Sequence, residues 1–131
     1  MANPNIVAVT NILGGNLGWN LTATATTTLV TVAAEKILKI NRLTVANVDG
    51  TNSATVNLYV DGLTTAGATG LSATGASATV YIAKTISVPA DSTLVLSDTP
   101  IYLMEGDILK GGASAASDLD LFISYEVLDD A

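Results

Sequence analysis

The chain has no cysteine and no histidine among its 131 residues. Without cysteine it can form no disulfide and offers no thiolate nucleophile. Without histidine as well, it can build neither a Ser-His-Asp nor a Cys-His arrangement, nor a zinc site of Cys and His ligands. Only carboxylate chemistry or oxygen-ligated hard metals remain. We therefore predict a protein that is not an enzyme and has no catalytic residues, cofactor or metal site.

Basic residues are also scarce, since 5 Lys and Arg stand against 12 Asp and Glu, giving a net charge of −7. Such a chain repels phosphate backbones and anionic lipid headgroups, so we expect neither nucleic acid nor membrane as a partner. No stretch approaches the roughly 20 apolar residues of a membrane helix. Residues 1–5 carry no basic side chain and no signal-peptide core follows them. We expect synthesis in a host cytoplasm without export.

The residues that are abundant favour strands and turns. Thr and Val favour strands, whereas Gly and Asn interrupt them. Apolar residues recur with period two, and no segment shows a capped helical stripe. The length suits one domain. We predict that residues 1–131 form a single all-β domain, an antiparallel β-sandwich of eight or more short strands, with a jelly roll as the preferred topology.

The clearest strand lies near the C-terminus, where apolar residues alternate with polar ones. Its predicted buried face is Leu119, Leu121, Ile123, Tyr125 and Val127. Its polar face carries Asp118, Asp120, Phe122, Ser124 and Glu126. Two further strands are predicted over 55–60, with Val56, Leu58 and Val60 inward, and over 79–88, with Val80, Ile82, Ile86 and Val88 in phase. Shorter strands are predicted at 5–10, 21–27, 29–33, 93–96, 102–104 and 108–110.

Two irregularities and several turns punctuate this pattern. Lys84 interrupts the apolar face of its strand, which indicates a bulge, a strand end or a paired lysine. The alternation changes phase within 37–48, which predicts a bulge near Asn41-Arg42. An Asp-Gly hairpin turn is expected at 48–52, and further turns are expected at 88–91 and 103–108. Residues 61–78, rich in Gly, Ala and Thr, are expected to form a long projecting loop.

Several polar groups could mark a site, and each has a structural interpretation that we prefer. The acidic pairs Asp118/Asp120 and Asp129/Asp130 could serve a glycosidase or bind Ca²⁺, but a solvated strand face and a charged tail explain them better. Residues 47–52 resemble a calcium loop that lacks its acidic ligands, so a turn is preferred. Lys36, Lys39 and Arg42 could bind an acidic partner, although lysines also guard strand edges.

The candidate partner-contact residues are apolar: Ile6, Val7, Val9, Trp19 and Phe122. Trp19 follows the Gly-rich stretch 14–18 and could stack on a sugar, anchor a protein partner or close the end of the sandwich. Phe122 falls on the polar face of its strand. Residues 1–10 form an N-terminal arm that could add as a strand to the sheet edge of another molecule. We expect this arm to be the main contact and the loop 61–78 an accessory one.

Four stretches carry a resemblance: residues 1–7; 40–50, INRLTVANVDG; 82–91, IAKTISVPAD; and 102–107, YLMEGD, followed by 115–119, AASDL. Together they resemble a family of small virion structural proteins of tailed bacteriophages, notably marine and cyanobacterial phages. The resemblance implies a capsid decoration or cement protein in the virion. It also implies the major capsid protein or another virion protein as partner, and a homo-oligomer or symmetric array in the particle. The loop 61–78 is longer than that family implies. The alternatives are a tail, baseplate or fibre subunit and a carbohydrate-binding module.

Overall fold

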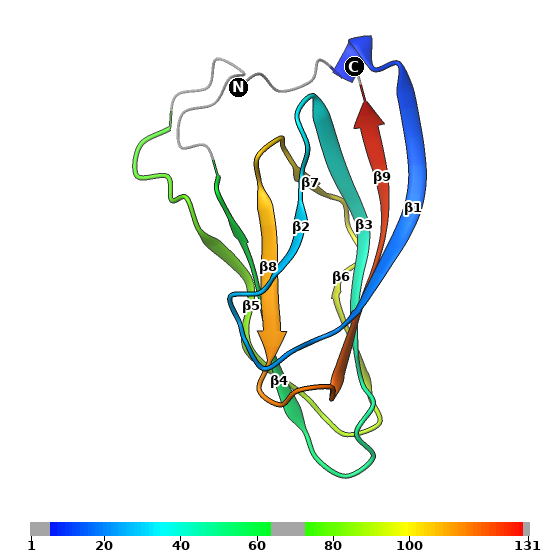
Figure 1. The fold of residues 1–131 in the computed structure, drawn as a ribbon, viewed down its shortest axis with the longest axis vertical. Coiled ribbons are helices and arrows are strands. Elements are labelled where there is room, and N and C mark those ends of the chain that lie inside the picture. The colour runs from blue at the N-terminus through cyan, green and yellow to red at the C-terminus, as the bar shows by residue number, and fades with distance from the viewer. Residues whose placement is uncertain (1–5, 64–72, 130–131) are drawn as a thin grey trace.

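The protein is a sandwich of two antiparallel β-sheets (Figure 1). The computed structural model describes residues 6–63 and 73–129. Over these ranges one short 3-10 helix precedes nine strands. The elements are η1 Ile6–Ala8, β1 Asn11–Asn20, β2 Thr28–Thr31, β3 Lys36–Asn47, β4 Ala54–Asp61, β5 Val80–Val88, β6 Thr93–Ser97, β7 Ile101–Leu103, β8 Ile108–Ala113 and β9 Leu119–Asp129. The predicted all-β sandwich is confirmed.

The strands pair as a rolled-up hairpin. β1 pairs with β9, β2 with β8, β3 with both β6 and β7, and β4 with β5, so the pairs are nested along the chain. Sheet A has the order β1-β9-β3-β6, with β7 also on β3, and sheet B has the order β2-β8-β4-β5. Successive pairs alternate between the sheets. This is the topology of a jelly roll, as the sequence predicted.

The core lies between the sheets and comes from alternate residues of the inner strands. In β9 the predicted parity is confirmed over 119–123, because Leu119, Leu121 and Ile123 are at most 1% exposed whereas Phe122 is 48% exposed. Beyond Ile123 the prediction holds only in part, since Tyr125 and Val127 are half-buried and Leu128, of the opposite parity, is buried. In β4 the predicted inward residues Val56, Leu58 and Val60 are also buried. Such side chains dominate stability, since each removes its apolar surface from water.

Strand β3 is central in sheet A, and the predicted phase change within it is a bulge. Its register against β9 shifts between Ile40 and Arg42, so the prediction near Asn41-Arg42 is confirmed. Because β3 lies between β9 and the strands β6 and β7, the interpretation of Lys36, Lys39 and Arg42 as guards of a strand edge is wrong.

Strand β5 is the edge of sheet B, and it too carries a bulge. The register against β4 shifts on both sides of Leu58, so that Lys84 and Thr85 together face the single residue Asn57. Thr85 has a positive φ of 52°, and its N–H donates to Asn57 Oδ1 at 3.0 Å. The bulge that Lys84 indicated is therefore confirmed.

The predicted inward face of β5 is wrong in part. Ala83 and Val88 are buried, whereas Val80 is 50% and Ile86 41% exposed. The bulge moves the side chains on its two sides out of phase. The strand also has a neighbour on one side only, so alternation there does not guarantee burial.

The segment around β1 differs most from prediction. No strand forms at 6–10, where residues 6–8 are helical; residues 1–5 lie outside the described part. The Gly-rich stretch 14–18, which should interrupt strands, instead lies inside the ten-residue strand β1. Packing favours a small residue there: a Cβ on Gly15 would lie 2.7 Å from Tyr125 Oη, so a larger residue would require the Tyr125 side chain to move. Tertiary contact has overridden the local preference.

Residues 21–27, predicted as a strand, form the connection that carries the chain from sheet A to sheet B (Figure 1). Leu21 inserts into the core, with 1% exposed. The connection lies against β8, where the Ala113 N–H donates to the Thr22 carbonyl oxygen at 2.9 Å. A Cβ on Gly112 would lie 2.7 Å from the Thr24 carbonyl oxygen. This close backbone approach requires glycine.

Two of the predicted connections are the turn at 48–52 and the loop at 61–78. The turn at 48–52 links β3 of sheet A to β4 of sheet B, so it is a crossing between sheets and not a hairpin. Of the predicted projecting loop 61–78, residues 64–72 lie outside the described part. Its described ends are tied together, since the Leu63 N–H donates to the Ala78 carbonyl oxygen at 3.0 Å and Thr79 Oγ1 donates to Asp61 Oδ1 at 2.7 Å.

Candidate functional site

The first candidate surface is the described part of the N-terminal arm together with the start of β1. Ile6 is 60% exposed and Val7 95%, and Ile12 and Leu13 on β1 are 62% and 57% exposed. Val9 is half-buried. The structure thus brings Ile6, Val7 and Val9 to one end of the sandwich, as a run of apolar surface along the chain. A contiguous exposed apolar surface of this kind is a candidate contact site.

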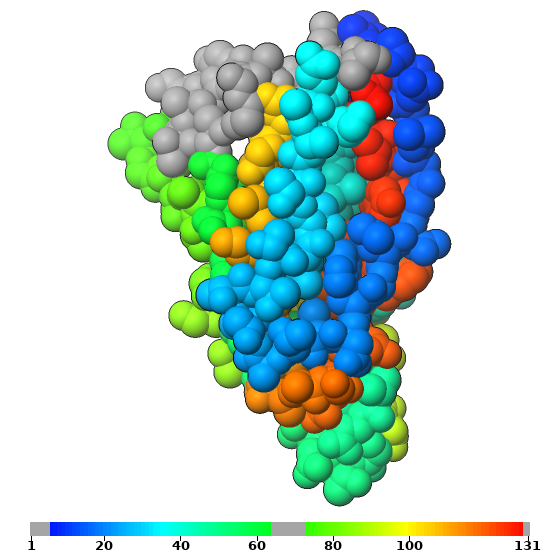
Figure 2. All heavy atoms as spheres, in the orientation of Figure 1, coloured from blue at the N-terminus to red at the C-terminus, as the bar shows by residue number. Residues whose placement is uncertain are grey.

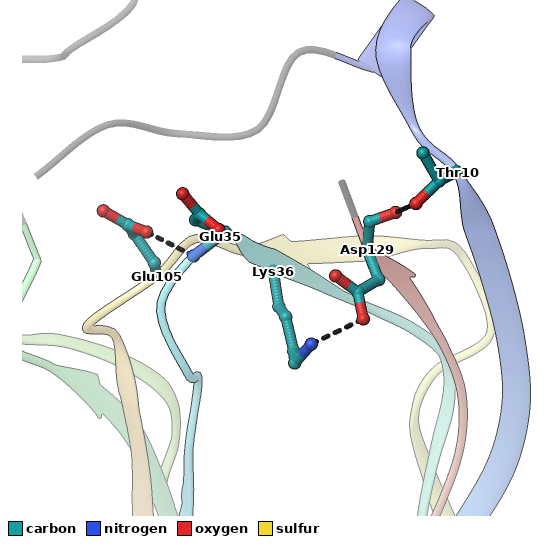
Figure 3. Close-up of polar contacts among 5 residues, drawn as sticks. All are labelled: Thr10, Glu35, Lys36, Glu105 and Asp129. Atoms are coloured by element: carbon teal, nitrogen blue, oxygen red, sulfur yellow. Dashed lines mark hydrogen bonds and ion pairs between the residues drawn. The ribbon is translucent and has the colours of Figure 1, made fainter. Parts of the chain in front are cut away.

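This end of the molecule is fixed to sheet A by hydrogen bonds (Figure 3). The Thr10 N–H and Oγ1 both donate to the Asp129 carbonyl oxygen, at 2.9 and 3.0 Å. Lys36 Nζ forms an ion pair with Asp129 Oδ2 at 2.6 Å (Figure 3). The apolar segment therefore leaves the sheet from an anchored point. Of the suggested acidic pair Asp129/Asp130, the first is engaged with Lys36 and the second lies outside the described residues.

The second candidate surface joins Trp19 and Phe122. Gly18, Trp19, Asn20, Asp120, Leu121 and Phe122 line a shallow hollow with a volume of about 380 Å³. Asn20 Nδ2 donates to Asp120 Oδ1 at 2.7 Å. Trp19 packs partly against the core, and Phe122 is exposed on the outer face of sheet A. The structure places these two aromatic residues at the opposite end of β1 from Ile6 and Val7.

Two buried carboxylates lie on the turn between β7 and β8, and both hold backbone. Glu105 accepts the Glu35 N–H at 2.5 Å (Figure 3), where Glu35 has a positive φ of 61°. Asp107 Oδ2 accepts the Met104 N–H at 2.8 Å. Burial raises the pKa of Asp107, and the bond from Met104 opposes that rise. Asp107 closes its own turn, and Glu105 ties that turn to the connection between β2 and β3, so both roles are structural.

In the segment 47–52, side-chain and backbone oxygen atoms accept hydrogen bonds from the segment itself. The Asp49 carboxylate accepts the N–H groups of Thr51 and Asn52 at 2.7 and 3.3 Å. These hydrogen bonds, with one from the Asn52 side chain, lower the pKa of Asp49. Buried Asn47 donates to the carbonyl oxygens of Asn52 and Val88. The turn interpretation explains the segment. Within 6–63 and 73–129, no three acidic groups converge as metal ligands would.

The sequence reasoning missed a third surface, the open side of the sandwich where β1 and β2 are the edge strands. A mostly apolar cleft of about 180 Å³ lies there, with Lys36 as its one charged lining residue. Its apolar lining includes Leu17, Val30, Val32, Leu38, Tyr125 and Val127. The first charged side chain in the sequence is Glu35. Figure 2 shows that the chain from β1 to β2, blue to cyan, covers much of the face turned to the viewer. The charge-free run of residues 1–34 was the available signal.

Comparison with known proteins yields structural likenesses of low score. No protein-family model and no curated protein matches the sequence. A chain from disulfide-linked pili of Bacillus endospore appendages matches with a TM-score of 0.46 and 14% identity, over 92% of this chain and 88% of that one. The VP2 subviral particle of infectious bursal disease virus matches with 0.32 and 10%, over 92% of this chain and 32% of that one. The structure of the Gt strain of that virus gives 0.30 and 10%.

This chain therefore spans about a third of the viral chain that it matches, at 32%. Scores and identities at this level carry no argument about function, and the assignment to a jelly roll rests on the strand order alone. A separate finding concerns helices: over the described ranges, none is long and apolar enough to cross a membrane.

Proposed function

We propose that this chain is a non-enzymatic structural protein of a tailed-phage virion, and that it decorates the outside of the capsid shell. The observation that carries the proposal is the run of exposed apolar residues from η1 into β1, on a chain with no Cys or His. Such a chain is suited to act by burying surface against a partner, here the major capsid protein or another virion protein.

The resemblance of four segments to small virion proteins supports the virion as the location. Three of the four segments contain turns or crossings between sheets in this fold: 40–50, 82–91 and 102–107. They therefore specify architecture. A jelly roll also suits a stable, compact shell component, but the fold hosts many functions and does not by itself define one.

The arm is the better anchor for the particle. Ile6 and Val7 present large apolar side chains, and the Thr10–Asp129 bonds fix the point at which the arm leaves the sheet. The segment 61–78 is rich in Gly, Ala, Ser and Thr, whose small side chains bury little apolar surface against a partner. It serves better as an accessory contact or an outward-facing tip.

Incorporation into particles tests the proposal. The double variant Ile6→Asp, Val7→Asp should bind capsid shells less than the native chain. Val48→Asp, a single substitution of the same kind at a 53% exposed valine outside the arm, should bind normally. Circular dichroism should show both variants folded. If the arm variant binds normally while deletion of 62–77 abolishes binding, the loop is the anchor.

Copy number separates the shell from the tail. A decoration protein should be present once for each repeating position of the shell, whereas a baseplate or fibre subunit should occur in a few copies per particle. Labelled protein seen only at the tail would replace the decoration role by the tail role and leave the virion assignment in place.

The Trp19–Phe122 hollow favours a second candidate, a carbohydrate-binding module. An exposed aromatic ring can stack on a sugar, and amide and carboxylate oxygens beside it can accept hydrogen bonds from the sugar hydroxyls. Phe122, Asn20 and Asp120 provide these groups. Glycan binding that is lost in Phe122→Ala, but kept in Tyr102→Ala on β7, would favour this function over decoration.

A further inference from the structure

The four sheet edges of the sandwich differ in how they are protected. An exposed edge invites pairing with another strand, and proteins block it with bulges, lysines, prolines or short strands. β2 is 4 residues long with an irregular register, β6 is 5 residues long with a shift, and β5 carries a bulge with Lys84. β1 has none of these features.

Strand β1 is long, regular and uncharged. It pairs with β9 over 10 residues without a register shift. Its sequence, NILGGNLGWN, contains no charged residue and no proline. In the described part of the chain, β9 is the one strand that pairs with it. Among residues 6–63 and 73–129, its other edge is therefore unpaired.

The register shows which backbone groups point outward. The Leu21 N–H donates to the Leu119 carbonyl oxygen at 2.8 Å, which continues the β1–β9 register by one pair. Bonded pairs alternate along an antiparallel ladder. The odd-numbered residues of β1 therefore bond to β9, and the outward groups belong to the even-numbered Ile12, Gly14, Asn16 and Gly18. Two of these are glycines, so side chains leave the edge accessible.

The distribution of charged residues along the chain favours a second copy as the partner of the β1 edge. The chain carries −7 in total, and all of its charged side chains follow residue 34. Two copies therefore repel each other over most approaches, and the repulsion is weakest where the uncharged strands β1 and β2 meet. A second copy brings an edge of the same length and regularity, which the four-residue β2 cannot match.

We propose that β1 pairs antiparallel with β1 of a second copy about a two-fold axis, joining the two A sheets into one. With the axis at Gly15, the even-numbered residues form the bonded pairs, and Leu13 lies opposite Leu17 of the second copy. These leucines are 57% and 38% exposed, and Leu17 lines the apolar cleft. Pairing covers them and closes an isologous dimer. The dimer requires no capsid, so it stands or falls independently of the decoration role.

The test is the oligomeric state of the full chain, measured by sedimentation velocity over a range of concentrations. The native chain should form dimers. Asn16→Lys places a charge at the axis, and Gly14→Pro removes an outward donor without touching the β9 ladder. A Cβ on Gly14 meets nothing within 4 Å, so the fold should tolerate a side chain there. Each change acts twice, so the dimer dissociation constant should rise by about tenfold or more. Ser87→Lys on the β5 edge should leave it unchanged.

Register is tested separately, because the native chain has no cysteine. The variants Leu13→Cys and Leu17→Cys, mixed and oxidised, should form the mixed disulfide in preference to either homodimer. A native chain that is monomeric throughout, or dimers that survive both Asn16→Lys and Gly14→Pro, would overturn the proposal. Open chains of copies would show β1–β2 pairing and would overturn the two-fold arrangement.

Discussion

The two lateral sides of the sandwich were built differently. On one side β5 and β6 form the edges, with bulges in both, a positive φ at Thr85 and Lys84 stacked 5.1 Å above the Tyr81 ring. On the other side β1 and β2 form the edges, and the chain there, from 11 to 34, has no charged side chain. The first side is protected against pairing, whereas the second is left open along β1.

On the proposed pairing, this difference separates the surfaces of an acidic β-protein that repel a second copy from the one that associates with it. Its charges lie in residues 35–131 and keep most surfaces apart. The uncharged side then offers one direction of approach. The same segregation predicts that changes beside β1 and changes beside β5 should have different consequences, which the following experiments measure.

The largest expected contrast is in the cost of truncating two isoleucines, one in β9 beside β1 and one in β5 on the opposite side of the sandwich. Ile123 of β9 pairs with Leu17 of β1 and is fully buried, so Ile123→Ala should lower the free energy of unfolding by about 2–5 kcal/mol. Ile86 of β5 is 41% exposed, and the same truncation there should cost about 1 kcal/mol or less. Chemical denaturation of both variants measures the difference. Equal costs would contradict the burial that separates the two sides.

A smaller contrast uses glycines on the β1 side. Gly112→Ala must displace the backbone of the 21–27 connection, and we expect a loss of about 1–3 kcal/mol. Gly14→Ala meets open space on β1 and should stabilise by up to about 1 kcal/mol, because it restricts the unfolded chain. Thermal unfolding at low protein concentration, where dimers are absent, compares them. A destabilising Gly14→Ala would show that the sheet face at Gly14 is not open space.

The ion pair between Lys110 and Asp61 on sheet B lowers the pKa of Asp61. Lys110 Nζ lies 2.8 Å from Asp61 Oδ2 and, with Thr79 and the Gly62 N–H, lowers the pKa of Asp61 to about 2. The stabilisation is present above the ordinary pKa of 3.8 and is lost as pH falls towards 2. In Lys110→Met, NMR titration should show the pKa of Asp61 moving back towards its ordinary value. No movement would mean that the hydrogen bonds to Thr79 and Gly62 suffice.

The smallest effect concerns buried Asp107. Because burial raises its pKa, the folded state favours the protonated carboxyl and loses stability as pH rises through that pKa. Asp107→Asn keeps an oxygen acceptor for the Met104 N–H and removes the ionisation. The variant should therefore gain stability relative to the native chain above pH 4, read from melting temperatures across a pH series. A constant difference across that series would show that Asp107 does not ionise in this way.

Periodicity was sufficient to predict the inner strands. Leu119, Leu121 and Ile123 alternate in sequence and are buried in the structure, and the phase change in 37–48 located a real bulge. The jelly-roll preference was also confirmed by the nested strand pairs. The burial pattern and the bulge depend on local alternation, which a sequence displays directly. The nested order of the strands does not, and its prediction rested on the number and spacing of the short strands.

The β1 region could not be predicted in the same way. Its glycines oppose a strand by local preference, yet Gly15 leaves room for the Tyr125 side chain, which is distant in sequence. Strand 21–27 was predicted from Thr residues whose carbonyl oxygens instead meet β8. The contact residues Trp19 and Phe122 were brought together by β1–β9 pairing. Contacts between residues about 100 positions apart have no local signature.

Hydrogen exchange along β1 tests the account most directly. At low protein concentration, the outward amides of Ile12, Gly14, Asn16 and Gly18 should exchange fast, and those of Leu13 and Leu17, bonded to β9, should exchange slowly. At high concentration the four outward amides should become protected, while the amides of the β5 edge should not change. Outward amides that exchange at the same fast rate at every concentration would contradict pairing between copies through β1.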